Sequence, residues 1–138
     1  MVWVGLNGTT GIEPYNYVKN GGGTMFTIND INKDTMTEVM KKACDIAGDG
    51  CDCIYVTIDI DVVDQAYSAG TGSYIYGGIT AVQLLEAADA ISENDKVKGI
   101  DIVEVAPNLD ATGNTARLAA TTLISFLKPR LFEKTEKR

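Results

Sequence analysis

The stretch Cys53-Ile54-Tyr55-Val56-Thr57-Ile58-Asp59-Ile60-Asp61-Val62-Val63-Asp64 decides the fold of this chain. Its first half is a nearly continuous run of apolar and β-branched residues, which is typical of a strand buried in a parallel sheet. Two acidic residues, Asp59 and Asp61, close the run. Because strand side chains alternate, residues two apart share a face, and we expect both carboxylates to point the same way.

Asp59 and Asp61 are the first candidate site. Two carboxylates about 6–7 Å apart repel each other by about 2–3 kcal/mol at an effective dielectric constant near 20. Burial adds a desolvation cost for each charge, and a divalent cation would remove both penalties. Taken alone, the same two residues fit a strand that simply ends in solvent equally well.

The composition is that of a globular chain. Its 138 residues are 45% hydrophobic and 22% charged, which suits a single domain with its own core. The net charge of −7 argues against nucleic acid or an anionic membrane surface as a partner. We find no apolar run near the ~18 residues of a transmembrane helix and no signal peptide. An odd number of cysteines, three, fits a reducing compartment, so we expect a cytoplasmic protein.

The chain contains no histidine. Histidine is the usual general base and a common metal ligand, so chemistry here must use carboxylates, water or thiols, or groups from another polypeptide. Cys44, Cys51 and Cys53 do not indicate a zinc site, because a fourth ligand is missing.

Predicted strands and helices alternate along the chain. Strands are expected at 2–6, 24–28, 53 to either 59 or 61, and 98–105, and helices at 14–19, 35–47 (capped by Asp34), 81–91 and 114–127. This order predicts an α/β fold with a parallel sheet of about four strands and helices on its faces. Residues 1–132 would form one portion of such a domain, and 133–138 a polar tail.

Two further segments carry candidate functional features. The loop of about 17 residues after Asp61 is long for a compact domain and ends in the capping box Thr80-Ala81-Val82-Gln83. Glu104 lies at the end of the last apolar strand, where burial without a partner would be costly, so a cationic partner is expected. A surface glutamate at a strand end is the alternative. Ligands of parallel sheets bind beyond the carboxyl ends of the strands, where Asp59, Asp61 and Glu104 all fall.

Together these segments resemble the ureohydrolase family, which includes arginase, agmatinase, guanidinobutyrase and formimidoylglutamase. Four family motifs occur in the family's order: Ser-x-Asp-x-Asp-x-x-Asp-Pro as 57–65, Pro-Gly-Thr-Gly as 69–72, Gly-Gly-Leu-Thr as 77–80, and Glu-Val-x-Pro as 104–107. The match covers nearly the whole chain. Gln65, Ala69 and Ser73-Tyr74 replace the expected Pro, Pro and Thr-Pro, which points to a divergent subfamily.

The resemblance implies an arginase-like, three-layer α/β fold. The complete family site holds two manganese ions bridged by hydroxide, which attacks a guanidino or formimino carbon. By the resemblance, Asp59 and Asp61 would be metal ligands, and Glu104 would bind the cationic group of a small amidine substrate. No catalytic residue is assigned to this chain.

The chain resembles only the C-terminal half of the family. The other metal ligands of the family lie upstream, in Gly-Gly-x-His and Asp-x-His-x-Asp motifs that are absent here. The expected function is therefore the C-terminal portion of a binuclear manganese ureohydrolase, agmatinase-like, which is inactive alone. Its expected partners are the missing N-terminal half or further copies in a homo-oligomer.

Two other functions stay open at this point. A non-catalytic binding or assembly subunit could pair with a full-length relative through an exposed sheet edge. A small magnesium-dependent phosphotransferase would also place Asp-x-Asp after a strand, although its downstream lysine and acidic-pair motifs are not found in suitable places.

Overall fold

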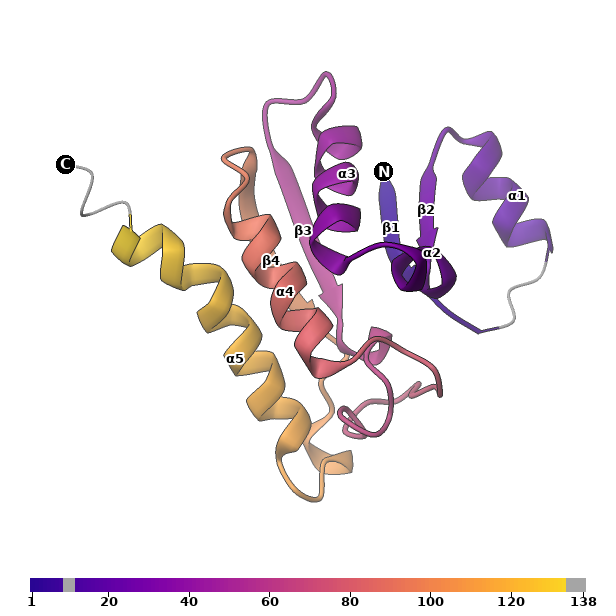
Figure 1. The fold of residues 1–138 in the computed structure, drawn as a ribbon. Coiled ribbons are helices and arrows are strands. Elements are labelled where there is room, and N and C mark those ends of the chain that lie inside the picture. The colour runs from indigo at the N-terminus through magenta and orange to yellow at the C-terminus, as the bar shows by residue number, and fades with distance from the viewer. Residues whose placement is uncertain (9–11, 134–138) are drawn as a thin grey trace.

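The computed structural model describes residues 1–8 and 12–133 (Figure 1). Strands and helices alternate along it, as the sequence predicts. The elements are β1 (Val2–Leu6), α1 (Ile12–Asn20), β2 (Thr24–Thr27), α2 (Ile28–Lys33), α3 (Met36–Gly48), β3 (Ile54–Asp59), the 3-10 turn η1 (Ile60–Val62), α4 (Ala81–Ser92), β4 (Val97–Val103), the 3-10 turn η2 (Pro107–Leu109), α5 (Asn114–Lys128) and the π-helical turn η3 (Pro129–Glu133). The expected polar tail lies outside the described residues from 134 onward.

Threonine side chains cap the N-termini of the helices α2, α3 and α4. The predicted capping box is confirmed, because the Gln83 N–H donates to Thr80 Oγ1 at 3.2 Å and the Thr80 N–H donates to Gln83 Oε1 at 2.9 Å. The expected cap at Asp34 is wrong by one residue. Thr35 caps α3 by accepting the Glu38 N–H at 3.2 Å, and the preceding residues form α2, which the sequence reasoning missed.

The four strands form two parallel pairs. β1 pairs with β2, and β3 pairs with β4 in a register that sets Thr57 opposite Asp101. All four strands point the same way in Figure 1, and β1 lies between β3 and β2. The predicted parallel α/β architecture is therefore confirmed, but within residues 1–8 and 12–133 the strands do not join into a single sheet.

One layer of helices packs on both strand pairs. Val39 of α3 and Leu84 of α4 belong to a buried cluster against which Val4, Phe26 and Ile58 pack, so both pairs contribute to the same core. A second cluster includes buried side chains from α3, α4 and α5 together with the amino ends of β3 and β4. Burying these apolar groups is the main stabilising contribution to the fold.

The other face of β3 and β4 is open. Tyr55 is 65% exposed there and Val103 is 39% exposed. The Tyr55 ring lies over Gly99, where an added Cβ would come within 2.7 Å of it, and its hydroxyl donates to the Asp101 carboxylate at 2.7 Å. In the part of the chain that the structure describes, no helix is both long and apolar enough to cross a membrane.

Candidate functional site

The two candidate aspartates lie where β3 ends. Asp59 is the last residue of the strand, and its carboxylate caps η1 by accepting the Asp61 N–H at 3.2 Å. The expected strand alternation does not extend to Asp61, because the chain turns into η1 at Ile60. The two carboxylates are nevertheless brought together, since a local hydrogen bond replaces strand geometry in holding them at one place.

The surroundings of Asp61 disfavour the charged form of its carboxyl group. Its partial burial, together with the charge and a hydrogen bond of the neighbouring Asp59, raises its pKa to about 6. The charge of Glu104 adds to this shift. Each cause disfavours a second or third negative charge at this end of the sheet, so the arrangement favours the approach of a cation.

Glu104 directly follows β4. Its φ of 63° is the only positive value among the described residues other than glycine. A left-handed backbone at a residue with a side chain costs about 1–2 kcal/mol. Such conformations cluster at functional sites and persist only where the surroundings hold them. Glu104 is exposed, so the expectation that its burial demands a cationic partner is not supported by this structure.

Asp64 holds the loop that follows the two aspartates. Its carboxylate accepts the N–H groups of Ala66 at 2.8 Å and Gly77 at 2.7 Å, which lie at the two ends of the loop. These hydrogen bonds to the charged form lower the pKa of Asp64. An isolated parallel bridge between Val63 and Ile79 closes the same loop. Asp64 therefore holds the two ends of this loop together.

Gly70 connects this loop to the Glu104 segment and to α5. Its N–H donates to the buried Thr115 Oγ1 at 2.8 Å, and its carbonyl accepts the Ala106 N–H at 2.8 Å. A Cβ at Gly70 would lie 2.4 Å from the Asp110 Cβ, so only glycine fits. The Asp110 carboxylate in turn caps α5, accepting N–H groups at 3.0 and 3.1 Å.

Sequence reasoning missed this connection. The signal was present in part, because Gly70 belongs to a recognisable Gly-Thr-Gly motif and the acidic Asp110 lies shortly before α5, whose first N–H groups lack partners within the helix. The partner Thr115, however, is 45 residues away along the chain. Only the folded structure shows that it holds the backbone beside Glu104.

The residues present do not complete a metal site. Among residues 1–8 and 12–133, no group of three or more Asp, Glu, Cys or His side chains is placed to hold a metal ion. Asp59 and Asp61 supply oxygen donors suited to manganese, but the sequence contains no histidine to add nitrogen ligands. A binuclear centre would need ligands from outside this chain.

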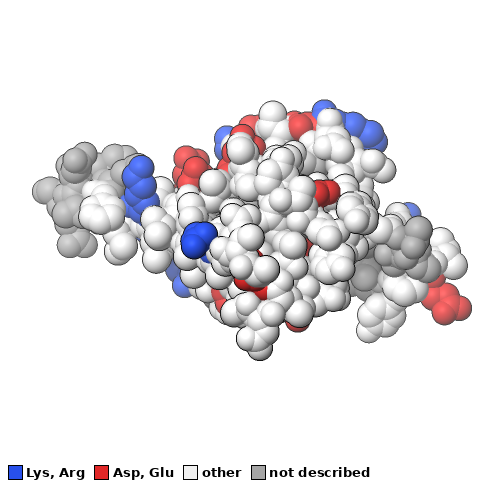
Figure 2. All heavy atoms as spheres, turned by 90° about the horizontal axis from the view of Figure 1, so that it is seen from below, with Lys and Arg blue, Asp and Glu red and all other residues white. Residues whose placement is uncertain are grey.

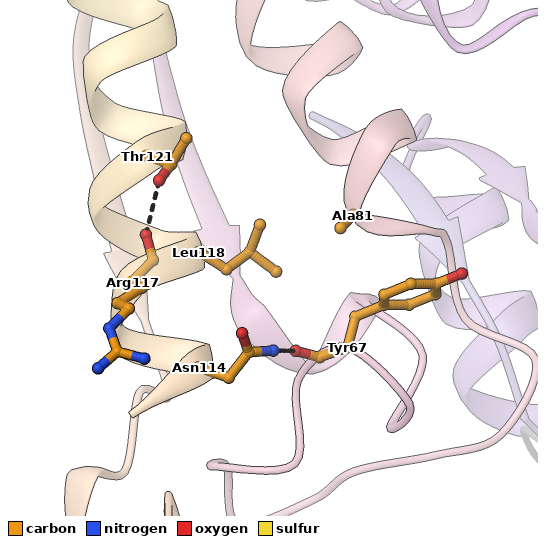
Figure 3. Close-up of a pocket in the computed structure, with 6 residues that line it drawn as sticks. All are labelled: Tyr67, Ala81, Asn114, Arg117, Leu118 and Thr121. Atoms are coloured by element: carbon orange, nitrogen blue, oxygen red, sulfur yellow. Dashed lines mark hydrogen bonds between the residues drawn. The ribbon is translucent and has the colours of Figure 1, made fainter. Parts of the chain in front are cut away.

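The carboxyl-end face of the molecule is shown in Figure 2. It is mostly uncharged, and acidic groups appear on it as separate small patches. A cavity of about 290 Å³ is lined by the start of α4, the start of α5 and Tyr67 (Figure 3). Asn114 Nδ2 donates to the Tyr67 carbonyl at 2.7 Å beside it. None of Asp59, Asp61 and Glu104 lines this cavity.

Comparison with known proteins identifies the family. Residues 1–128 match the arginase family. The formimidoylglutamase of Halalkalibacterium halodurans is 32% identical over 129 residues, which are 93% of this chain and 40% of the relative. The agmatinase of Cronobacter sakazakii is 36% identical, with 86% of this chain and 38% of the relative covered. The chain thus spans about two fifths of the length of these curated relatives.

Solved structures agree with this assignment. The formimidoylglutamase of Bacillus subtilis superposes with a TM-score of 0.86 at 30% identity, over 92% of this chain and 40% of that one. The arginase of Bacillus caldovelox, at 23% identity, shares the fold with a TM-score of 0.86 over 95% of this chain and 44% of its own. The chain therefore has an arginase-like fold and belongs to the arginase family.

Proposed function

We propose that this chain is the C-terminal portion of a manganese-dependent ureohydrolase that hydrolyses a guanidino or formimino C–N bond. The observation that carries the proposal is the placement of Asp59 and Asp61 at the end of β3 within a chain of the arginase family. Relatives named formimidoylglutamase and agmatinase support this reaction class.

In this proposal Asp59 and Asp61 contribute carboxylate ligands to a metal centre whose remaining ligands lie elsewhere. The raised pKa of Asp61 fits that role, because the binding of a cation would relieve the repulsion that causes it. Two carboxylates alone are too few ligands for a binuclear metal centre. No hydrolytic step is therefore assigned to the isolated chain.

Glu104 is proposed to bind the cationic end of the substrate. A carboxylate can accept two parallel hydrogen bonds from a guanidinium or formimino group. Its left-handed backbone is held from one side by the hydrogen bond between Ala106 and Gly70, which fixes the segment that carries it. Glu104 is exposed and takes part in no ion pair with the other described residues, so a ligand can reach its carboxylate without first breaking one there.

The test is product release from a panel of amidines. The purified 138-residue chain, supplied with manganese, is incubated with agmatine, arginine and N-formimidoylglutamate, and urea, ammonia and formamide are measured. We expect no release by the chain alone. We expect activity when the remaining portion of a formimidoylglutamase or agmatinase is supplied, and its loss with Asp59→Asn or Asp61→Asn. Robust hydrolysis by the chain alone contradicts the proposal.

A non-catalytic assembly subunit is the second candidate. The open face of β3 and β4, with Tyr55 and Val103 exposed, favours association with another polypeptide. Activity that never appears on reconstitution, despite stable association, would favour this role. The arginase-family match leaves the phosphotransferase alternative without a supporting observation.

A further inference from the structure

Two free cysteines lie between α3 and β3, at the end of the strand opposite to Asp59 and Asp61 (Figure 1). They are Cys51 and Cys53, separated by Asp52, and both are exposed. The six residues of β3 follow this dithiol directly and rise by about 20 Å in all. The dithiol is therefore well removed from the candidate manganese ligands and has no part in the proposed hydrolysis.

Hydrogen bonds hold the backbone on both sides of the dithiol. The Cys51 N–H donates to the Gly48 carbonyl at 3.3 Å. Directly after the dithiol, the Ile54 N–H donates to the Lys96 carbonyl at 2.7 Å. The Cα atoms of residues two apart are separated by at most about 7 Å, and the residue between the cysteines lies at a bend. Both exposed side chains can therefore reach a single ion between them.

The third cysteine does not join this pair. Cys44 is 7% exposed and belongs to the buried cluster that contains Ile54. Burial raises the pKa of the Cys44 thiol, which disfavours the thiolate that binds metals. Among residues 1–8 and 12–133, no third Asp, Glu, Cys or His side chain is placed to hold a metal ion together with the dithiol. An ion bound there would have two sulfur ligands from this chain.

The surroundings of the dithiol are acidic. Asp52 lies between its two cysteines. A cavity of about 660 Å³ at the end of α3 is lined by three further aspartates, Asp45, Asp49 and Asp95. Of the residues that line it only Lys96 is basic, and its Nζ donates to a backbone carbonyl at 2.6 Å. This excess of negative charge attracts a cation and repels anionic thiol reagents such as oxidised glutathione.

We propose that Cys51 and Cys53 bind one copper(I) ion through their two thiolate sulfurs. Thiolates are soft ligands, and they select soft ions such as Cu(I). Cu(I) has a closed shell and accepts two thiolates in a linear arrangement, whereas zinc in structural sites takes four ligands. Each thiol releases its proton to solvent, so one ion and two thiols give a singly negative bis-thiolate complex and two protons.

Anaerobic titration of the reduced 138-residue chain with Cu(I) tests the site. The ion is supplied as its complex with the chromogenic chelator bicinchoninate, whose loss of colour reports transfer to the protein. We expect one ion per chain and ultraviolet absorption from thiolate-to-copper charge transfer. X-ray absorption at the copper edge should show two sulfur neighbours. The sedimentation coefficient should not change, because both ligands come from one chain.

Three variants separate the dithiol from its surroundings. Cys51→Ser/Cys53→Ser removes both ligands and should weaken Cu(I) binding by at least about hundredfold, since changes beside metal ligands already cost 10–100-fold. Cys44→Ala is the matched control, because it removes the buried thiol and should keep the stoichiometry and affinity. Asp52→Asn removes one charge about 7 Å from the ion and should weaken binding only about threefold. Circular dichroism checks that each variant keeps the fold.

Four results would overturn the inference. These are no transfer of Cu(I) from bicinchoninate to the reduced chain, equal binding by Cys51→Ser/Cys53→Ser, one ion shared between two chains, and displacement of Cu(I) by an equal concentration of Zn²⁺. None of these measurements uses an amidine or manganese. Their outcome therefore does not depend on whether the proposed function is correct.

Discussion

Thr115→Val should destabilise the fold by removing one buried acceptor. Thr115 is fully buried at the start of α5, and its Oγ1 accepts the Gly70 N–H at 2.8 Å. Valine has nearly the same shape, so the substitution leaves packing intact and leaves that N–H without its partner. Gly70 is itself buried, which keeps water from replacing the lost acceptor.

The expected cost is about 1–3 kcal/mol, the desolvation penalty of an unsatisfied buried backbone group. With a urea dependence of about 1–3 kcal/mol per molar, this corresponds to a fall of roughly 1 M in the unfolding midpoint. Because the hydrogen bond holds the loop next to the Glu104 segment, hydrogen exchange at Gly70 and Ala106 should also accelerate.

Thr122→Val is the matched control. Thr122 is equally buried in the same helix, but its hydroxyl donates to the Leu118 carbonyl at 2.9 Å. That carbonyl can still accept a backbone bond within the helix, so its loss should change the unfolding free energy by less than about 1 kcal/mol. Urea unfolding followed by circular dichroism measures both variants. Equal, small effects of the two substitutions would show that the Gly70 N–H does not depend on Thr115 for an acceptor.

Three further predictions concern the same framework. Gly70→Ala places a Cβ 2.4 Å from the Asp110 side chain and should cost about 1–3 kcal/mol in thermal unfolding, whereas Gly72→Ala, with open space around it, should be nearly neutral. The pKa of Asp64 is lowered in the folded state, so its stabilisation is present above the unfolded pKa and is lost as pH falls through the folded value. The stability difference between the original chain and Asp64→Asn should therefore shrink on acidification from pH 6 to pH 3, and a constant difference would contradict this. The Arg130 guanidinium donates to three backbone carbonyls at 2.8–3.3 Å near the end of α4. Arg130→Met should therefore lower the free energy of unfolding in urea by about 1–3 kcal/mol. An unchanged free energy of unfolding would show that solvent replaces these hydrogen bonds.

Regular elements were predictable from the sequence because their signals are local. Alternating apolar runs and helical periodicity indicate the strands and the long helices, and the Thr80 capping box fixes the start of α4. The parallel order follows from the alternation of strand and helix. Asp59 closes an apolar run, so its position at the carboxyl end of β3 was also predictable. Ligands of parallel sheets bind at that end.

What could not be predicted depends on contacts between distant segments. Asp61 leaves the strand because the Asp59 carboxylate caps a 3-10 turn, which competes with strand geometry at that point. The positive φ of Glu104 is unfavourable locally and is held by tertiary contacts. The short helix α2 follows β2 directly, and the capping by Thr27 that begins it is hidden in an apolar, strand-like sequence.

The separation into two strand pairs was also beyond sequence reasoning. Periodicity reports which residues are apolar, and it does not report which strand lies beside which. Val4 and Ile58 pack on one core from different pairs, so the pattern of burial is the same as in a continuous sheet.

Whether the metal site is incomplete in this chain can be measured by thermal unfolding of the 138 residues with and without Mn²⁺, repeated with Asp59→Asn/Asp61→Asn. A complete site with a hundredfold excess of metal over its dissociation constant would add about 2.7 kcal/mol, which would raise the melting temperature by roughly 10 °C. We expect no such rise at micromolar Mn²⁺, because the other ligands are missing. A rise of that size that the double variant loses would contradict the claim that the site is incomplete.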